Sequence, residues 1–214
     1  MEGQKLIFLP FFFKELRDKS ALHYESIPAL NWGNTKNDTY ELSNRYHFVW
    51  KTQNMPTGGI YPIKQDVHEY IKNFVNENRI SKVTKGPQKI TAYIGVDSQN
   101  YLSYTRFVAI IALYVERNGA HLLISRSDLP KIYDYRYKLL REIDVLGELA
   151  RNFKDFFNSI DVEFELHADL NNSANHKSNG VVEEATNYIK YLGFNLKIKD
   201  ESFAATHAAD YFCK

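Results

Sequence analysis

Apolar residues become regularly spaced only from residue 63 onward. Between Ile63 and Phe74 they recur every three or four positions, which predicts an amphipathic helix over residues 63–77. Gly193 and Ser202 mark two later helix ends, because glycine favours a left-handed C-terminal cap and serine favours an N-cap. The spacing and these caps predict three more helices, over residues 134–158, 181–192 and 203–212.

Five shorter apolar runs predict β-strands, over residues 90–96, 106–117, 121–126, 162–168 and 195–198. Short turns separate the first three strands, so we expect them to form an antiparallel meander. Helices precede the last two strands, and crossovers of this kind are right-handed. The chain is therefore predicted to be α/β, with a mixed five-stranded sheet and helices on both faces.

Residues 1–60 mix apolar and polar side chains without a period. We interpret them as an irregular N-terminal extension or arm, which either clasps the core domain of residues 61–214 or orders on a protein partner. The apolar stretch Leu6–Phe13 is too short to span a bilayer, and Pro10 interrupts it. No membrane role is expected from this stretch.

The composition restricts the kind of protein and its compartment. Among 214 residues 44% are hydrophobic, which is enough for one domain with a substantial core. A net charge of +1 excludes a strongly cationic coating protein and still leaves room for a local basic face. Cys213 is the single cysteine, so an internal disulfide or a cysteine zinc cluster is excluded, and a reducing compartment such as the cytoplasm is expected.

Four acidic residues carry most of the chemical information: Asp97, Glu142, Asp169 and Asp210. Asp97 and Asp169 each follow an apolar strand, whereas the other two belong to predicted helices. Carboxylates that meet at the edge of a sheet repel each other unless cations lie between them. Their hard oxygen atoms favour Mg²⁺ or Mn²⁺, and two such ions can hold the attacking and leaving oxygens of a phosphodiester.

Each acid also has an ordinary interpretation. Asp97 and Asp169 could cap turns or loops next to their strands, and Asp210 could be a solvated helix residue. On the long helix, Glu142 lies at the border of the apolar stripe and is the expected metal ligand. Glu148 is expected to point toward solvent on the opposite face.

Two short motifs accompany these acids. The first strand ends in Gly95-Val96-Asp97-Ser98-Gln99, and the chain closes with Ser202-Phe203-Ala204-Ala205 and then Ala209-Asp210. Residues 60–214 resemble the ribonuclease H-like superfamily on this basis. They are most similar to a small bacterial and phage family whose first strand carries Gly-Thr-Asp-Ser-Gln, where Val96 here replaces the threonine.

The resemblance implies a metal-dependent nuclease. Asp97 would bridge two Mg²⁺ or Mn²⁺ ions, with Glu142, Asp169 and Asp210 as the other ligands, and the substrate would be a nucleic acid. RNA, DNA and hybrid substrates cannot be distinguished from the sequence, nor can an endonuclease from an exonuclease. Basic residues at the start of the long helix could contact phosphates or could belong to a mixed solvated face.

A second hypothesis keeps the fold without catalysis. Residues 1–60 would suit an arm that orders on a neighbouring subunit, as in a scaffolding component of a larger assembly. Such a subunit could belong to a phage virion. The near-neutral charge of the chain is consistent with this hypothesis, whereas four acids in the order of a nuclease site count against it.

Overall fold

The computed structural model describes residues 48–53, 60–80, 86–199 and 201–214. All of these belong to one compact unit, Leu42–Lys214. Most of the extension predicted over residues 1–60, including the apolar stretch near its start, lies outside the described residues. In the described part of the chain, no helix has the length and apolar character needed to cross a membrane.

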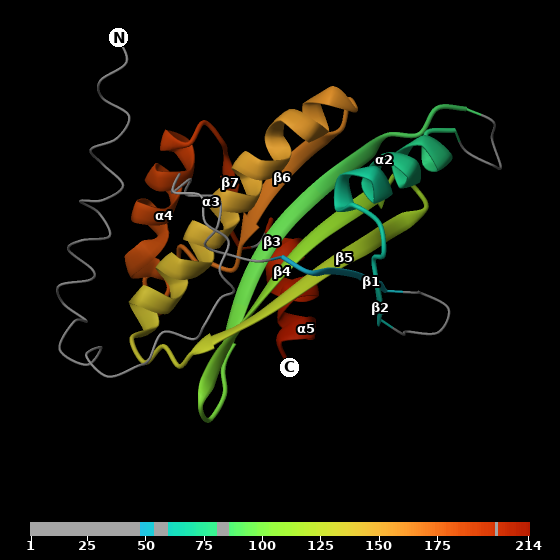
Figure 1. Cartoon of the computed structure of the whole chain (residues 1–214). Coiled ribbons are helices and arrows are strands. Elements are labelled where there is room, and N and C mark those ends of the chain that lie inside the picture. Colours follow the sequence, from blue (N-terminus) through green and yellow to red (C-terminus); the bar gives the residue numbers. More distant parts are fainter. Residues whose placement is uncertain (1–47, 54–59, 81–85, 200) are drawn as a thin grey trace, which may run out of the picture. The chain divides into compact units, whose positions relative to one another are not determined.

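A seven-stranded mixed sheet forms the centre of this unit (Figure 1). The strands stand in the order β2-β1-β5-β4-β3-β6-β7. Their bounds are β1 (Trp50–Gln53), β2 (Ile60–Pro62), β3 (Ile90–Asn100), β4 (Tyr104–Val115), β5 (Gly119–Pro130), β6 (Glu163–Ala168) and β7 (Leu196–Lys197). The five predicted strands correspond to β3–β7, and the expected α/β class with its meander and parallel crossovers is confirmed.

Strands β1 and β2 extend the sheet beyond the five that were predicted. β1 pairs antiparallel with β5, with Thr52 opposite Leu123, and β2 pairs antiparallel with β1. Trp50 is buried at this edge, where its ring meets Phe153 edge to face. The described residues just before residue 61 therefore contribute a strand to the same sheet as the rest of the domain.

Helices cover both faces of the sheet, and their bounds are α2 (Val67–Asn78), α3 (Tyr135–Ser159), α4 (Asn179–Tyr191), η3 (Ala204–Ala209) and α5 (Asp210–Cys213). On one face, Val108 and Ile110 of β4 pack with Phe212 of α5. Successive residues of a strand point to opposite faces, so the neighbouring residues of β4 face the other side, and they too are buried. This two-sided burial explains the nearly continuous apolar runs of β3 and β4.

Local interactions adjust the predicted helix boundaries. The helix predicted from residue 63 begins at Val67, because the Asp66 carboxylate accepts hydrogen bonds from the backbone N–H groups of His68 and Glu69. Gly193 has φ +85°, the left-handed conformation expected after α4.

The last helix differs more strongly from an ordinary α-helix. Residues Ala204–Ala209 form a π-helical segment, η3, before α5 begins. The backbone N–H of Asp210 accordingly donates to the carbonyl of Ala205, five residues earlier. A segment with more residues per turn changes the direction in which each later side chain points. Asp210 therefore projects differently than it would from a regular α-helix.

Candidate functional site

Parallel pairing of β3 with β6 brings two of the expected site residues next to each other. Val96 pairs with Ala168 at the end of the shared ladder, so Asp97 and Asp169 follow at adjacent positions of neighbouring strands. This edge is formed by the carboxyl end of β6, where loops leave the sheet. The Asp97 carboxylate accepts a hydrogen bond of 2.8 Å from the backbone N–H of Ser98.

Glu142 approaches the same edge from helix α3. It is buried, and its carboxylate accepts a hydrogen bond of 2.5 Å from the Ser98 hydroxyl. Ser98 therefore connects the backbone next to Asp97 with the side chain of Glu142. The inward orientation of Glu142 agrees with its position at the border of the apolar stripe.

The expectation that Glu148 points toward solvent was wrong. Glu148 is buried, as is Asp144. Helix α3 lies against the sheet on one side and against α4 on another, where Gly147 faces Leu192 and Tyr188. The apolar periodicity identified the side that meets the sheet, but a second buried side depends on where α4 packs.

Asp210 at the start of α5 completes the group of acids. Its negative charge and that of Asp169 both raise the pKa of Asp97, so each of the two lies within electrostatic reach of Asp97. The Asp210 side chain is 41% accessible to solvent, whereas the Glu142 side chain is only 5% accessible. The site is thus deep at Glu142 and open at Asp210.

Burial makes two of these carboxyls unusually weak acids. The pKa of Asp97 is raised to about 6, chiefly because burial disfavours its charged form. The pKa of Glu142 is raised to about 8, again chiefly by burial, although the nearby Lys138 ammonium and the Ser98 hydroxyl act in the opposite direction. Both carboxyls would ionise more readily if additional positive charge were present beside them.

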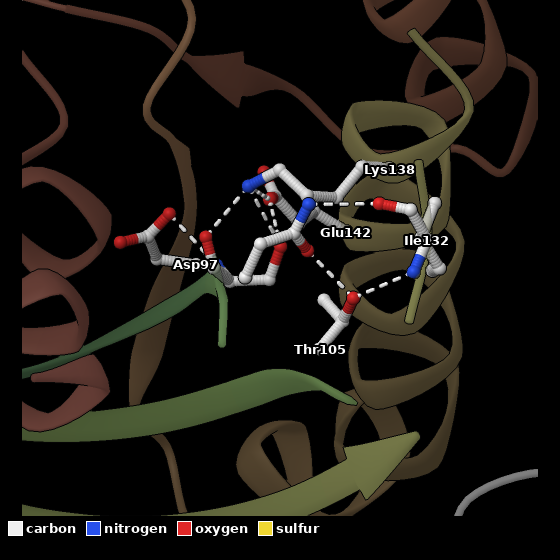
Figure 2. A network of polar contacts seen from close by, with 7 residues as sticks. Asp97, Thr105, Ile132, Lys138 and Glu142 are labelled. Carbon is white, nitrogen blue, oxygen red and sulfur yellow. Dashed lines mark hydrogen bonds and ion pairs between the residues drawn. The ribbon is translucent and has the colours of Figure 1, made fainter. Parts of the chain in front are cut away.

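Three lysines stand beside these acids. Lys138 is one of the basic residues at the start of the long helix that were expected either to contact phosphates or to face solvent, whereas Lys199 and Lys214 carried no expectation. Lys138 Nζ lies 3.3 Å from Glu142, Lys199 Nζ lies 4.0 Å from Asp169, and Lys214 Nζ lies 2.7 Å from Asp210. A signal for two of these pairs is present in the sequence, because lysine follows or precedes its acid by four residues on a helix. Figure 2 shows the Lys138 side chain reaching toward Glu142 beside Asp97.

The donor set fits a hard divalent cation in its chemistry, since it consists of carboxylate oxygens near hydroxyls. Thr206 of η3 donates its hydroxyl to Asp169 at 3.3 Å. Within the described ranges, however, no three side chains of His, Cys, Asp or Glu are arranged so that they could hold one metal ion. Three of the four acids, Glu142, Asp169 and Asp210, are instead each close to a lysine ammonium.

A partly buried polar network fixes the start of α3 relative to the β3–β4 hairpin (Figure 2). The Thr105 hydroxyl donates to Asn100 at 2.6 Å and accepts from the backbone N–H of Ile132 at 2.8 Å. The Asn100 amide in turn donates to the Ile132 carbonyl at 2.8 Å. This network holds the chain that leads into α3, and with it the helix turn that carries Lys138 and Glu142.

Comparisons with known proteins agree with this fold. The family described as Ribonuclease H-like matches residues 66–214. The chain is also 27% identical over 164 residues to "Uncharacterized protein YkuK" of Bacillus subtilis (strain 168), an alignment that covers 70% of this chain and 90% of that protein. The comparison with solved structures found no match. Since the family match extends over more than half of its length, the chain belongs to the ribonuclease H-like family.

Proposed function

We propose that this domain is a metal-dependent nuclease that hydrolyses the phosphodiester bonds of a nucleic acid. The observation that carries the proposal is the position of Asp97 within β3 beside Asp169, the residue that directly follows β6, with buried Glu142 joined to β3 through Ser98. Membership of the ribonuclease H-like family supports the same chemistry. Fold alone does not determine activity, so the argument depends on these side chains.

Asp97, Asp169, Asp210 and Glu142 are the residues that would hold two Mg²⁺ or Mn²⁺ ions. When bound, such ions lower the pKa of an attacking water and stabilise the departing 3′ oxygen. The role of β3 is to hold Asp97 rigidly between β4 and β6. The role of Ser98 is to orient the Glu142 carboxylate through their hydrogen bond.

Two exposed tyrosines at the beginning of α3 and just before it support a nucleic acid as the substrate. The pKa of Tyr135 is raised by burial and also by the charges of Glu142, Asp169 and Asp97, so this ring lies near the site. Tyr133 is 84% accessible, and the Lys131 ammonium lies 5.4 Å from the centre of its ring. Exposed aromatic rings next to cations suit the stacking of unpaired bases and contact with phosphates.

The ion pairs favour a second candidate, a non-catalytic scaffolding subunit that keeps the fold. Lysine ammonium groups beside Glu142, Asp169 and Asp210 reduce the repulsion among the acids without a metal. A domain that no longer used divalent ions could therefore keep these acids. This candidate predicts a protein partner and no cleavage.

The test is cleavage of labelled single-stranded, duplex and hybrid substrates by the full chain. Reactions with Mg²⁺, Mn²⁺ or EDTA are compared for the wild type and for Asp97→Asn. The nuclease proposal expects cleavage by the wild type with a divalent ion and none with EDTA or with the variant. A wild type that is inert on every substrate and with both metals would favour the scaffolding candidate.

A further inference from the structure

The Lys138 ammonium lies in a cage of three oxygen atoms. Its Nζ is 2.6 Å from the Ser98 carbonyl, 3.0 Å from the Ser98 hydroxyl and 3.3 Å from the Glu142 carboxylate. A lysine ammonium has three N–H donors, so these contacts use its full hydrogen-bonding capacity. A carbonyl, a hydroxyl and a carboxylate are also oxygen ligands that a hard divalent cation accepts.

Burial distinguishes Lys138 from Lys214, which is also four residues from its acidic partner. Lys138 and Glu142 are four residues apart on a helix, as are Asp210 and Lys214. The side chain of Lys138 is 12% accessible, whereas that of Lys214 is 65% accessible. Solvent and salt screen the exposed pair strongly, but they screen the buried ammonium much less.

We propose that Lys138 is a built-in competitor of a divalent ion at the Glu142 side of the acid site. In the metal-free protein the Lys138 ammonium occupies the space between Ser98 and Glu142 where a cation would otherwise bind. An ion that binds there must displace it, because two cations a few ångströms apart in a poorly screened site repel each other. This inference rests on the proposed metal site.

Displacement is compatible with the chemistry of the side chain. Lysine is a flexible chain that carries a compact charge, so it can leave Glu142 and become hydrated without a change in the helix. The two ions of the proposed site would then bind unequally. An ion held by Glu142 would bind more weakly because it has to expel the buried Lys138. An ion held by Asp97 and Asp169 would meet only Lys199, which is 40% accessible and therefore better screened by solvent.

The experiment is a calorimetric titration of the purified full chain with Mn²⁺ at one fixed pH. We compare the wild type with Lys138→Met, which keeps the aliphatic stem, and with Lys138→Arg, which keeps the charge. Lys214→Met is the matched control, because it removes the exposed lysine of the equivalent pair. Circular dichroism verifies folding of each variant, and Lys138→Gln replaces the methionine variant if that one does not fold.

In Lys138→Met the weaker Mn²⁺ site should bind about tenfold more tightly or more, or become detectable where the wild type binds one ion. Lys138→Arg should retain wild-type binding, and Lys214→Met should change the affinity by less than about threefold. Unchanged or weaker binding in Lys138→Met overturns the inference, as do equal gains in Lys214→Met or an absence of Mn²⁺ binding in all variants.

Cleavage assays on the same proteins separate this inference from the proposed function. A wild type that cleaves nucleic acid while Lys138→Met binds Mn²⁺ no more tightly contradicts the inference and leaves the nuclease intact. The opposite outcome is that Lys138→Met binds Mn²⁺ more tightly than the wild type while the wild type cleaves no substrate. It supports the competition at Glu142 and contradicts the nuclease.

Discussion

The backbone of Ala204 occupies the space that a side chain on Gly95 would need. A β-carbon at Gly95 would lie 2.6 Å from the carbonyl carbon of Ala204 and 2.6 Å from the backbone nitrogen of Ala205. Real β-carbons do not approach backbone atoms so closely. The glycine two residues before Asp97 therefore allows η3 to pack directly on β3, and this contact fixes the helix that leads to Asp210.

Gly95→Ala should consequently move η3 away from β3 and destabilise the domain. Overpacking of a tight contact costs about 1–3 kcal/mol of the unfolding free energy, and backbone atoms cannot move aside as a flexible side chain can. Urea denaturation measures the loss. The matched control is Gly180→Ala in α4, where an added β-carbon would meet no atom within 4 Å, and it should be neutral or slightly stabilising. Equal stability of the two variants would contradict the role of Gly95.

Strands β3 and β4 could be predicted because two-sided burial leaves long apolar runs in the sequence, and the turn with Gly119 separates β4 from β5. The two-residue strand β7 is located by the Gly193 cap that ends α4 just before it. Strands β1 and β2 have four and three residues, too few for a reliable alternation, and they form because β5 offers an unpaired edge. Their presence is a consequence of tertiary pairing.

The site illustrates the same limit. Asp97, Asp169 and Glu142 could be chosen from strand ends and from one helical stripe. The π-helical segment before Asp210 could not, because its residue types do not distinguish it from an α-helix, and its close packing on Gly95 is visible only in the structure. The burial of Glu148 was missed for a related reason, since it depends on α4, a separate helix.

Asp97→Asn should abolish metal-dependent cleavage, with a loss of roughly hundredfold or more, which is typical when a preorganised charge interaction at a reacting centre is removed. The metal-free protein should be as stable as the wild type or slightly more stable. Burial already disfavours the charged form of Asp97, and an asparagine oxygen can still accept the hydrogen bond from the Ser98 backbone. Substrate cleavage and thermal unfolding are measured on the same preparations.

A suitable control for this variant is Asp155→Asn, which changes an exposed carboxylate on α3. It should leave cleavage and stability unchanged. Cleavage by Asp97→Asn at the wild-type rate would exclude Asp97 as a required metal ligand.

Thr105→Val should destabilise the domain by about 1–3 kcal/mol, although the two side chains have nearly the same shape. Thr105 is fully buried, and the substitution leaves the backbone N–H of Ile132 without its acceptor and Asn100 without a donor. Thr105→Ser keeps the hydroxyl and should lose clearly less unfolding free energy than Thr105→Val. Chemical denaturation compares the two variants, and an equal loss in both would mean that packing of the methyl group, and not the polar network, stabilises the start of α3.

Glu142 should make the metal-free protein less stable as the pH rises. Its pKa is raised by burial from 4.5 to about 8 in the folded state, so between these values the folded protein holds a proton that the unfolded chain has released. The folded state thus binds more protons, and the unfolding free energy falls with increasing pH across this window, by up to about 1.4 kcal/mol per pH unit. Glu142 therefore contributes its full stability below pH 4.5, where it is protonated in both states, and this contribution is lost once the pH passes about 8.

Glu142→Gln removes this titration while its amide oxygen can still accept from Ser98 and Lys138. The variant should therefore gain stability relative to the wild type as the pH increases from 4.5 to about 8, with the two proteins most similar at the acid end. Urea denaturation at several pH values, in the presence of EDTA, measures the difference. Asp97 titrates in both proteins, so its own raised pKa largely cancels in the comparison. A difference in unfolding free energy that stays constant with pH would show that Glu142 is already ionised throughout this range, and that Lys138 neutralises it far more effectively than its burial opposes it.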